Sequence, residues 1–244
     1  MTIKDKVILV TGSAKRVGKC IALTLAKKGA NVIVNYSTSE EDAKLVTEEI
    51  KKLGVNSTAI KADISKADEV KSMIEKIIKE FGSIHVLVNN AAVFFKTPFK
   101  TLSEKDWDIN IDINLKGTFL CSKYAADVML KQKEGKIINT GDWSGIRPYT
   151  DYIPYCVSKA GVIALTKALA KTLAPDIQVN CILPGPIIFP DDFSEDEKKQ
   201  IISAIPLKKI GSPEDIAATV LFLIEGSDFI TGGMYAVDGG RLIS

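Results

Sequence analysis

The chain has 244 residues, of which 46% are hydrophobic and 25% are charged, and its formal net charge is only +2. This composition fits one globular domain with a full core, and the small net charge argues against a nucleic-acid partner. No apolar run reaches the roughly 18 residues of a membrane span, and no signal-peptide core follows Met1, so we expect a cytoplasmic protein without a membrane partner. The four cysteines are far apart and form no CxxC motif, so we predict reduced thiols and no metal site.

Short apolar runs alternate with longer helical patterns along the chain. The predicted strands are Val7–Val10, Val32–Val34, Thr58–Ala62, Val86–Val88, Lys136–Asn139, Val179–Leu183 and Tyr235–Val237. The predicted helices are Val17–Lys28, Glu40–Leu53, Ala67–Phe81, Glu104–Lys131, Tyr155–Ala174 and Asp215–Ile224. Because continuous apolar strands alternating with helices are typical of a parallel sheet covered on both faces, we predict one doubly wound α/β (Rossmann) domain over residues 1–244 with a seven-stranded parallel sheet.

The turn after the first predicted strand contains Gly12 and Gly18 and leads directly into the first helix. Glycine permits a tight turn and close approach of the backbone to a ligand, and a helix N-terminus offers N–H groups and a positive dipole end to a phosphate. Glycines also occur in ordinary strand–helix turns. At the first strand of an α/β chain, however, they favour nucleotide binding.

The end of the second strand indicates which nicotinamide cofactor is used. NAD-dependent enzymes often carry an acidic residue there for the ribose hydroxyls, but at this strand end no acid precedes Glu40. Lys15 and Arg16 add positive charge nearby, although both could be solvated turn residues. We therefore predict NADP(H).

Tyr155 and Lys159 are four residues apart, so on a helix their side chains share one face. Pro154 suits the first turn of that helix, and Pro175 ends it. A free phenol has a pKa of about 10, and a cation within roughly 4–6 Å lowers that pKa by stabilising the phenolate. The pair is therefore a candidate acid–base pair, although this spacing alone is also common on protein surfaces.

Taken together, these residues resemble the short-chain dehydrogenase/reductase family over essentially the whole chain. The supporting segments are Thr11-Gly12 to Gly18, Asp63 in Ala-Asp-Ile, Asn89-Asn90-Ala91-Ala92, Asn114 in Ile-Asn-Leu, Tyr155 with Lys159, and Asn180 to Pro184-Gly185. The resemblance implies that Tyr155 donates a proton, that Lys159 binds the nicotinamide ribose and that Asn114 anchors a water leading to Lys159. It also implies that Asp63 holds the adenine amino group and that Asn90 lies along the adenosine ribose.

The resemblance implies three sets of site residues. The expected catalytic residues are Asp142, Tyr155, Lys159 and Asn114. The expected cofactor contacts are Gly12, Lys15, Arg16, Val17, Gly18, Tyr36, Ser37, Thr38, Asp63, Ile64, Asn90, Ala91, Tyr155, Lys159, Pro184, Gly185 and Ile187. The expected substrate contacts are Arg16, Phe94, Asp142 and Tyr155. The family default is a homotetramer, with contacts expected on the helices 104–131 and 155–174, and residues 186–206 form either a mobile substrate lid or a solvated helical excursion.

Two departures from the family pattern suggest a branch. Asp142 replaces the serine that the family usually has thirteen residues before the tyrosine, and Arg16 replaces the middle glycine of the first turn. Both resemble the pteridine reductases. Two weaker matches are Phe94, where that branch stacks an aromatic on the pterin, and the segment Phe189-Pro190-Asp191-Asp192-Phe193, which resembles its substrate loop.

The chemistry of Asp142 favours the same branch. Ketone reduction develops an alkoxide, to which a serine hydroxyl can donate a hydrogen bond but an ionised aspartate cannot. Like charges about 4 Å apart cost on the order of 4 kcal/mol at an effective dielectric constant near 20, enough to slow a ketone reductase roughly a thousandfold. We therefore expect an NADPH-dependent reductase of a pteridine-type ring, such as a dihydropterin or dihydrofolate. The alternatives are a 3-oxoacyl-carrier-protein reductase or another ketone reductase, and a solvent-facing Asp142 that leaves Ser144 to act.

Overall fold

The computed structural model describes residues 1–189 and 193–244. All seven predicted strands are found in one parallel sheet with the order β3-β2-β1-β4-β5-β6-β7, which confirms the predicted architecture. The strands are β1 (Val7–Val10), β2 (Asn31–Tyr36), β3 (Ser57–Lys61), β4 (Val86–Asn89), β5 (Gly135–Thr140), β6 (Ile177–Pro184) and β7 (Met234–Val237).

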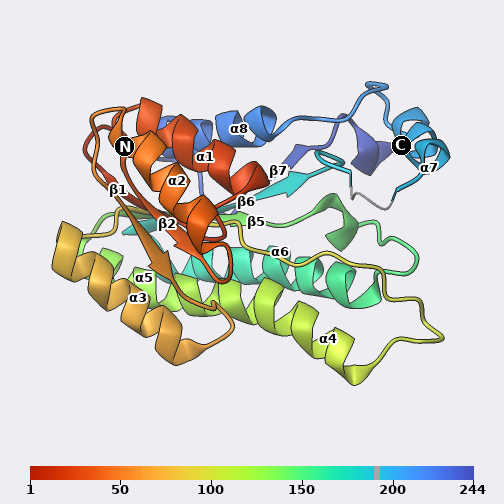
Figure 1. Cartoon of the computed structure of the whole chain (residues 1–244), viewed down its shortest axis with the longest axis horizontal. Helices are drawn as coiled ribbons and strands as arrows, with labels where there is room; N and C mark the ends of the chain where they lie inside the picture. Colours follow the sequence, from red (N-terminus) through yellow and green to blue (C-terminus); the bar gives the residue numbers. More distant parts are fainter. Residues whose placement is uncertain (190–192) are drawn as a thin grey trace.

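Helices cover both faces of the sheet (Figure 1). They are α1 (Arg16–Lys27), α2 (Glu40–Lys51), α3 (Ala67–Phe81), α4 (Glu104–Asn110), α5 (Gly117–Gln132), α6 (Ile153–Leu173), α7 (Glu195–Ser203) and α8 (Pro213–Glu225). The predicted single helix Glu104–Lys131 is interrupted by a π-helical segment, Ile111–Lys116, a distortion that often accompanies functional sites. In the segment predicted as a lid or helical excursion, α7 begins at a capping box formed by Ser194 and Glu197.

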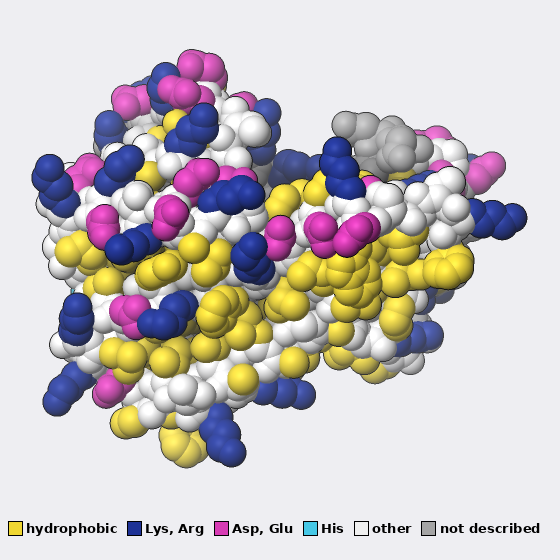
Figure 2. Space-filling view, turned by 90° about the horizontal axis from the view of Figure 1, so that it is seen from below, with side chains coloured by type: hydrophobic (Ala, Val, Ile, Leu, Met, Phe, Trp, Pro, Cys, Tyr) yellow, Lys and Arg dark blue, Asp and Glu magenta, His cyan; other side chains and the backbone are white. Residues whose placement is uncertain are grey.

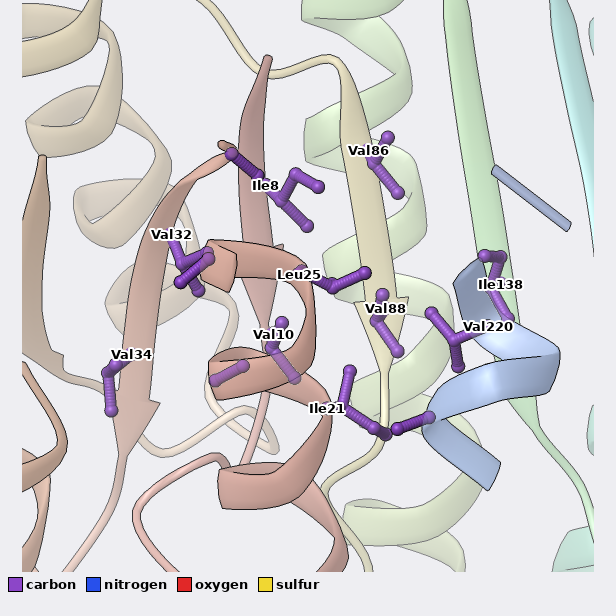
Figure 3. Close-up of a cluster of buried hydrophobic side chains, with 14 of the residues drawn as sticks. Ile8, Val10, Ile21, Leu25, Val32, Val34, Val86, Val88, Ile138 and Val220 are labelled. Atoms are coloured by element: carbon purple, nitrogen blue, oxygen red, sulfur yellow. The ribbon is translucent and has the colours of Figure 1, made fainter. Parts of the chain in front are cut away.

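Two hydrophobic cores lie on the two faces of the sheet because successive strand residues point to opposite sides. Ile8 and Val10 of β1 pack under α1, α2 and α8, where Figure 3 shows them with Leu25 and Val220. Leu9 lies in the other core, which is formed with α3, α5 and α6. Burial of both faces explains why the strands read as uninterrupted apolar runs.

The strand order creates the crevice in which the candidate site lies. From β1 the strand order runs to β2 and β3 on one side, and from β4 it runs to β5, β6 and β7 on the other. The order therefore reverses between β1 and β4, and a ligand cleft is expected where these two strands end. The loops after β1, β4, β5 and β6 all meet at this edge of the sheet.

Helix α6 carries Tyr155 and Lys159 into the same region, and Pro154 lies in its first turn as predicted. By length and composition α6 could cross a membrane, and 44% of its most apolar window is buried inside the structure. Because α6 packs against β6 and its two titratable site residues are buried, we interpret it as a core helix.

Candidate active site

A single cavity of about 1060 Å³ runs from the glycine turn to the start of α6. The predicted residues that line it are Gly12, Lys15, Arg16, Val17, Gly18, Ser37, Thr38, Asp63, Ile64, Asn90, Ala91, Phe94, Asp142, Tyr155, Lys159, Pro184, Gly185 and Ile187. Tyr36 and Asn114 are buried and do not belong to the lining. The fold therefore brings residues from most of the chain into one continuous space.

The two glycines of the first turn are required by packing. Gly12 has a φ of +60°, and a Cβ there would lie 2.8 Å from Ala91 Cα. A Cβ on Gly18 would lie 2.3 Å from the carbonyl oxygen of Gly12, closer than any real Cβ contact. The Asn90 amide donates hydrogen bonds to the carbonyl oxygens of Thr11 and Gly12, which ties the β4 end to the turn.

The N-terminus of α1 fits the diphosphate of a dinucleotide. Lys15 is its N-cap but makes no side-chain capping bond, and no acidic residue lies in the first turn. The first N–H groups of the helix therefore lack intrahelical or side-chain partners and face the cavity with the positive end of the helix dipole. This arrangement fits a nicotinamide dinucleotide bound along the predicted contacts.

The two cations of this turn differ in their partners. Lys15 Nζ lies 2.9 Å from Asp42 Oδ2 in an exposed ion pair. Arg16 has a φ of +51°, the left-handed conformation that the usual glycine adopts without strain, and within the described ranges it makes no ion pair. In particular, Arg16 does not pair with Asp142. Arg16 is thus the less neutralised cation at the cofactor end.

Tyr155 and Asp142 meet directly at the other end of the cavity. Tyr155 Oη donates a hydrogen bond to Asp142 Oδ2 over 2.9 Å, and the Ser144 main-chain N–H donates to Asp142 Oδ1 over 2.7 Å. The Asp142 carboxyl therefore lies beside the phenol, where the sequence placed it, and does not turn to solvent. Lys159 Nζ donates to the carbonyl oxygen of Thr140 over 2.8 Å and lies 5.7 Å from the centroid of the Tyr155 ring.

Burial controls the protonation of these groups. Burial and the neighbouring Asp142 carboxyl raise the pKa of Tyr155 well above its ordinary value, whereas we expected Lys159 to lower it. That expectation was wrong because Tyr155 is only 7% exposed and shares a hydrogen bond with a carboxyl group. Burial also raises the pKa of Asp142 and lowers that of Lys159. At neutral pH Tyr155 is therefore protonated, which is the form that donates a proton.

Ser144 does not replace Asp142 in this arrangement. Its side chain is 0% exposed, lies outside the cavity lining and has a hydroxyl without a hydrogen-bond partner in the described part of the chain. Its contribution is the main-chain N–H that holds Asp142 at the start of the 3₁₀ turn Trp143–Gly145. Ser144 therefore positions the carboxyl and cannot act as a hydroxyl donor from where it lies.

Asn114 supports the site from behind the lining. Its side chain accepts a hydrogen bond from the Val93 N–H, donates one to the Val93 carbonyl oxygen and donates another to Ser158 Oγ. The π-helical segment directs this amide toward the loop after β4. Asn114 thus joins that loop to α6, one residue before Lys159.

Four aromatic side chains form one side of the cavity, and we call Phe94, Trp143, Tyr149 and Tyr152 the aromatic wall. The Phe94 ring stacks on Tyr152 at 4.5 Å and 8°, and meets Tyr155 edge-on at 4.8 Å. Trp143 Nε1 donates a hydrogen bond to Tyr149 Oη. One face of Phe94 is thus covered by Tyr152, while the side chain as a whole is 41% exposed.

Two cations, Lys96 and Arg241, are among the cavity residues that sequence reasoning missed. Lys96 lies at the mouth, 3.3 Å from Glu197 of α7 and 5.1 Å from the centroid of the Phe193 ring. Arg241 follows β7, and no local motif marks it. Of the segment compared with a pteridine substrate loop, Phe189 and Phe193 line the cavity, while residues 190–192 lie outside the described residues.

Comparison with known proteins identifies the family and corrects the substrate class. A family model described as enoyl-(acyl carrier protein) reductase matches residues 12–241. A 3-oxoacyl-[acyl-carrier-protein] reductase FabG of Staphylococcus aureus is 44% identical over 239 residues, covering 96% of this chain and 97% of the relative. A 3-oxoacyl-[acyl-carrier-protein] reductase of Synechocystis sp. is 40% identical over 242 residues, covering 98% and 97%.

These relatives overturn the expected pteridine-type substrate and favour the alternative, a 3-oxoacyl or other ketone substrate. The chemical argument for a pteridine-type ring rested on an ionised Asp142. Burial raises the pKa of that carboxyl, and a protonated carboxyl can donate a hydrogen bond to a developing alkoxide much as a serine hydroxyl does. Without a pteridine-type substrate, the expected stacking of a pterin on Phe94 no longer applies.

Solved structures agree with the family. A putative short-chain alcohol dehydrogenase from Sinorhizobium meliloti has a TM-score of 0.93 at 30% identity, covering 100% of both chains. An NAD+-bound xylitol dehydrogenase has a TM-score of 0.92 at 28% identity, covering 98% of this chain and 100% of its own. The sheet order, the glycine turn and the tyrosine–lysine pair accord with these matches: the chain belongs to the short-chain dehydrogenase/reductase family.

Proposed function

We propose that this protein is an NADP(H)-dependent oxidoreductase that reduces the ketone of a 3-oxoacyl thioester to a hydroxyl group. The observation that carries the proposal is the hydrogen bond from Tyr155 Oη to Asp142 Oδ2, at one end of a cavity whose other end is the glycine turn. The names of the relatives support the acyl thioester class. When bound, the nicotinamide would supply a hydride to the carbonyl carbon.

Tyr155 would supply the proton. As negative charge develops on the carbonyl oxygen, the Tyr155 phenol donates its proton to that oxygen, and the product is the neutral alcohol. The raised pKa of Tyr155 keeps the phenol protonated near neutral pH, which is the form that reduction requires. Lys159, buried next to Tyr155, would hold the nicotinamide ribose and stabilise the phenolate that remains.

Asp142 would act as the second hydrogen-bond donor to the carbonyl oxygen. Its Oδ1 is occupied by the Ser144 N–H, so a proton on the carboxyl would reside on Oδ2, which lies next to the phenol. With its proton on Oδ2, Asp142 would share the carbonyl oxygen with Tyr155. The usual serine hydroxyl has this role in the family pattern, and burial of Asp142 supports the protonated form.

NADP(H) remains the proposed form of the cofactor. The β2 end carries Ser37 and Thr38 in the cavity lining without an acidic neighbour before Glu40, and Arg16 lies at the same end. Hydroxyl groups and an unpaired guanidinium can donate hydrogen bonds to a 2′-phosphate, whereas a carboxylate would repel it.

We also propose a cytoplasmic homotetramer. The face formed by α3 to α6 exposes hydrophobic side chains between charged ones (Figure 2). Trp107 of α4, Phe119 of α5 and Val157 of α6 are 40%, 44% and 41% exposed. Covering such residues with a second copy would remove apolar surface from water. Light scattering after size exclusion measures the molar mass; a monomer at micromolar concentration would contradict the tetramer.

The proposed activity is tested with NADPH and a panel of thioesters. We expect oxidation of NADPH with acetoacetyl-CoA, and little with crotonyl-CoA, the corresponding enoyl thioester. Preferential turnover of crotonyl-CoA would favour the enoyl reduction named by the family model over ketone reduction. Repeating the assay with NADH tests the cofactor; equal kcat/KM values for NADH and NADPH would contradict NADP(H) specificity.

A further inference from the structure

The end of the described chain forms one side of the substrate region. The Arg241 guanidinium lies over the Trp143 ring, with its Cζ 4.8 Å from the ring centroid, and donates a hydrogen bond to Ser244 Oγ over 3.1 Å. Arg147 donates to the main-chain carbonyl oxygens of Leu242 and Ser244, and Asp238 accepts a hydrogen bond from the Leu242 N–H. These contacts fix the short turn 241–243, which lies beside α7 (Figure 1).

Arg241 differs from the other cations that line the cavity. Lys15 is paired with Asp42 and Lys96 with Glu197, while Lys159 binds the Thr140 carbonyl oxygen at the reacting end. Arg241 has no carboxylate within ion-pair distance among residues 1–189 and 193–244. Arg16 and Lys159 share this property, but Arg16 lies in the glycine turn at the cofactor end and Lys159 lies beside Tyr155. Among the lining cations of the described chain, Arg241 is therefore the unpaired one that lies away from both the glycine turn and Tyr155.

The aromatic wall connects Arg241 to the catalytic tyrosine. Arg241 packs on Trp143, the Trp143 ring lies 4.9 Å from Tyr149, and the Phe94 ring lies 6.3 Å from Tyr149 and 4.8 Å from Tyr155. A substrate that lies along these rings has its ketone at Tyr155 and its distal end toward Arg241. The apolar surroundings lower the local dielectric constant and strengthen any charge pair formed there.

We infer that Arg241 binds a carboxylate on the substrate, so that the preferred substrates are 3-oxo thioesters whose acyl chain ends in a carboxylate. A guanidinium presents paired N–H donors that match a carboxylate, and stacking on Trp143 holds it in place before the substrate arrives. This inference rests on the proposed ketone reduction. It assigns a binding role to a residue that no sequence motif marks.

The test uses N-acetylcysteamine thioesters, which carry no phosphate, of 3-oxoadipate with a free distal carboxylate and of its distal methyl ester. In the wild-type protein we expect kcat/KM to be about tenfold higher for the carboxylate, the advantage typical of a partly desolvated ion pair. Arg241→Gln should bring this ratio to about one, and Arg241→Lys should leave an intermediate ratio. Arg147→Gln is the matched control, because it removes a neighbouring charge and loosens the same turn but should leave the ratio unchanged.

Equal ratios in wild type and Arg241→Gln would overturn the inference, as would an equal loss of ratio in Arg147→Gln. A second comparison, CoA against N-acetylcysteamine thioesters of one neutral acyl group, detects a phosphate ligand; a CoA preference that disappears only in Arg241→Gln would overturn the carboxylate assignment.

If no thioester is reduced, the proposed function fails separately. Glutarate binding to the NADPH-loaded protein, followed by NADPH fluorescence, then decides: weaker binding by at least fivefold in Arg241→Gln supports the inference, and equal binding contradicts it.

Discussion

The cofactor end and the substrate end of the cavity are built in different ways. At the cofactor end, the chemistry comes from the backbone: a glycine turn, the N–H groups of α1 and an asparagine that holds two carbonyl oxygens. At the substrate end, it comes from side chains on four separate segments, including Asp142 after β5, Phe94 after β4 and Arg241 after β7. Backbone geometry leaves a local pattern in the sequence, whereas a side-chain assembly does not.

Asp142 illustrates the difference between these two kinds of site. The family resemblance implied its position beside Tyr155, but not its protonation, because burial raises the pKa of the carboxyl. An ionised carboxyl would oppose ketone reduction and a protonated one would assist it. The same residue therefore supports opposite substrate classes according to its environment.

The largest predicted effect is a loss of catalysis at the substrate end without a loss of cofactor binding. Tyr155→Phe removes the proton donor, and we expect kcat for acetoacetyl-CoA to fall roughly a thousandfold because a positioned general acid contributes about that much. NADPH affinity, measured by fluorescence titration, should change by less than about threefold, since the dinucleotide is held mainly by backbone groups. Retention of more than a tenth of the wild-type kcat would show that Tyr155 is not the proton donor.

A substitution in the glycine turn, at the cofactor end, should weaken NADPH binding. Gly18→Ala places a Cβ 2.3 Å from the Gly12 carbonyl oxygen, which must displace the turn, and we expect NADPH affinity to fall on the order of a hundredfold. The control is Gly54→Ala, where a Cβ would meet no atom within 4 Å but φ is +84°. There we expect a lower Tm by circular dichroism and unchanged NADPH affinity. Comparable losses of affinity in both variants would contradict a specific role for the turn.

The pH dependence sharpens the role of Asp142. Because burial raises the pKa of its carboxyl, the active protonated form is lost as pH rises through that raised value, and kcat/KM should fall by up to tenfold per pH unit above it. The contribution of the same group to the free energy of unfolding has the same sign: it is present at low pH and lost as pH rises through the raised pKa.

Asp142→Ser provides the comparison for this pH profile. A serine hydroxyl does not titrate in this range, so its kcat/KM should stay flat where that of the wild type declines. A pH profile that is identical in wild type and Asp142→Ser would exclude the protonated carboxyl as a donor.

The smallest predicted effect distinguishes the two cations of the turn. Arg16→Gln should weaken NADPH binding about fivefold with little change for NADH, since Arg16 has no ion-pair partner in the described residues. Lys15→Gln should change NADPH affinity less than twofold, because Asp42 already neutralises Lys15 in an exposed pair of small energetic value. Isothermal titration with both cofactors measures the difference, and a larger effect at Lys15 would reverse the assignment.

The strands, most helices, the parallel sheet and the place of the glycine turn could be predicted from one sequence, because they follow from hydrophobic periodicity and backbone preferences over a few neighbouring residues. Helical spacing indicated that Tyr155 and Lys159 share a face, and the family resemblance implied that Asp142 lies beside Tyr155. The division of the helix over residues 104–131 by a π-helical segment was not visible, because it reflects the bonding of Asn114 to a distant loop.

The pKa shifts in the site and the composition of the substrate end follow from tertiary contacts. The pKa values of Tyr155 and Asp142 depend on water exclusion by residues that are remote in sequence. Arg241 reaches the cavity because β7 lies at the edge of the sheet next to β6, which places the turn after it against Trp143. Such long-range contacts leave no periodic or local trace in one sequence, and they determine which substrate the shared fold can accept.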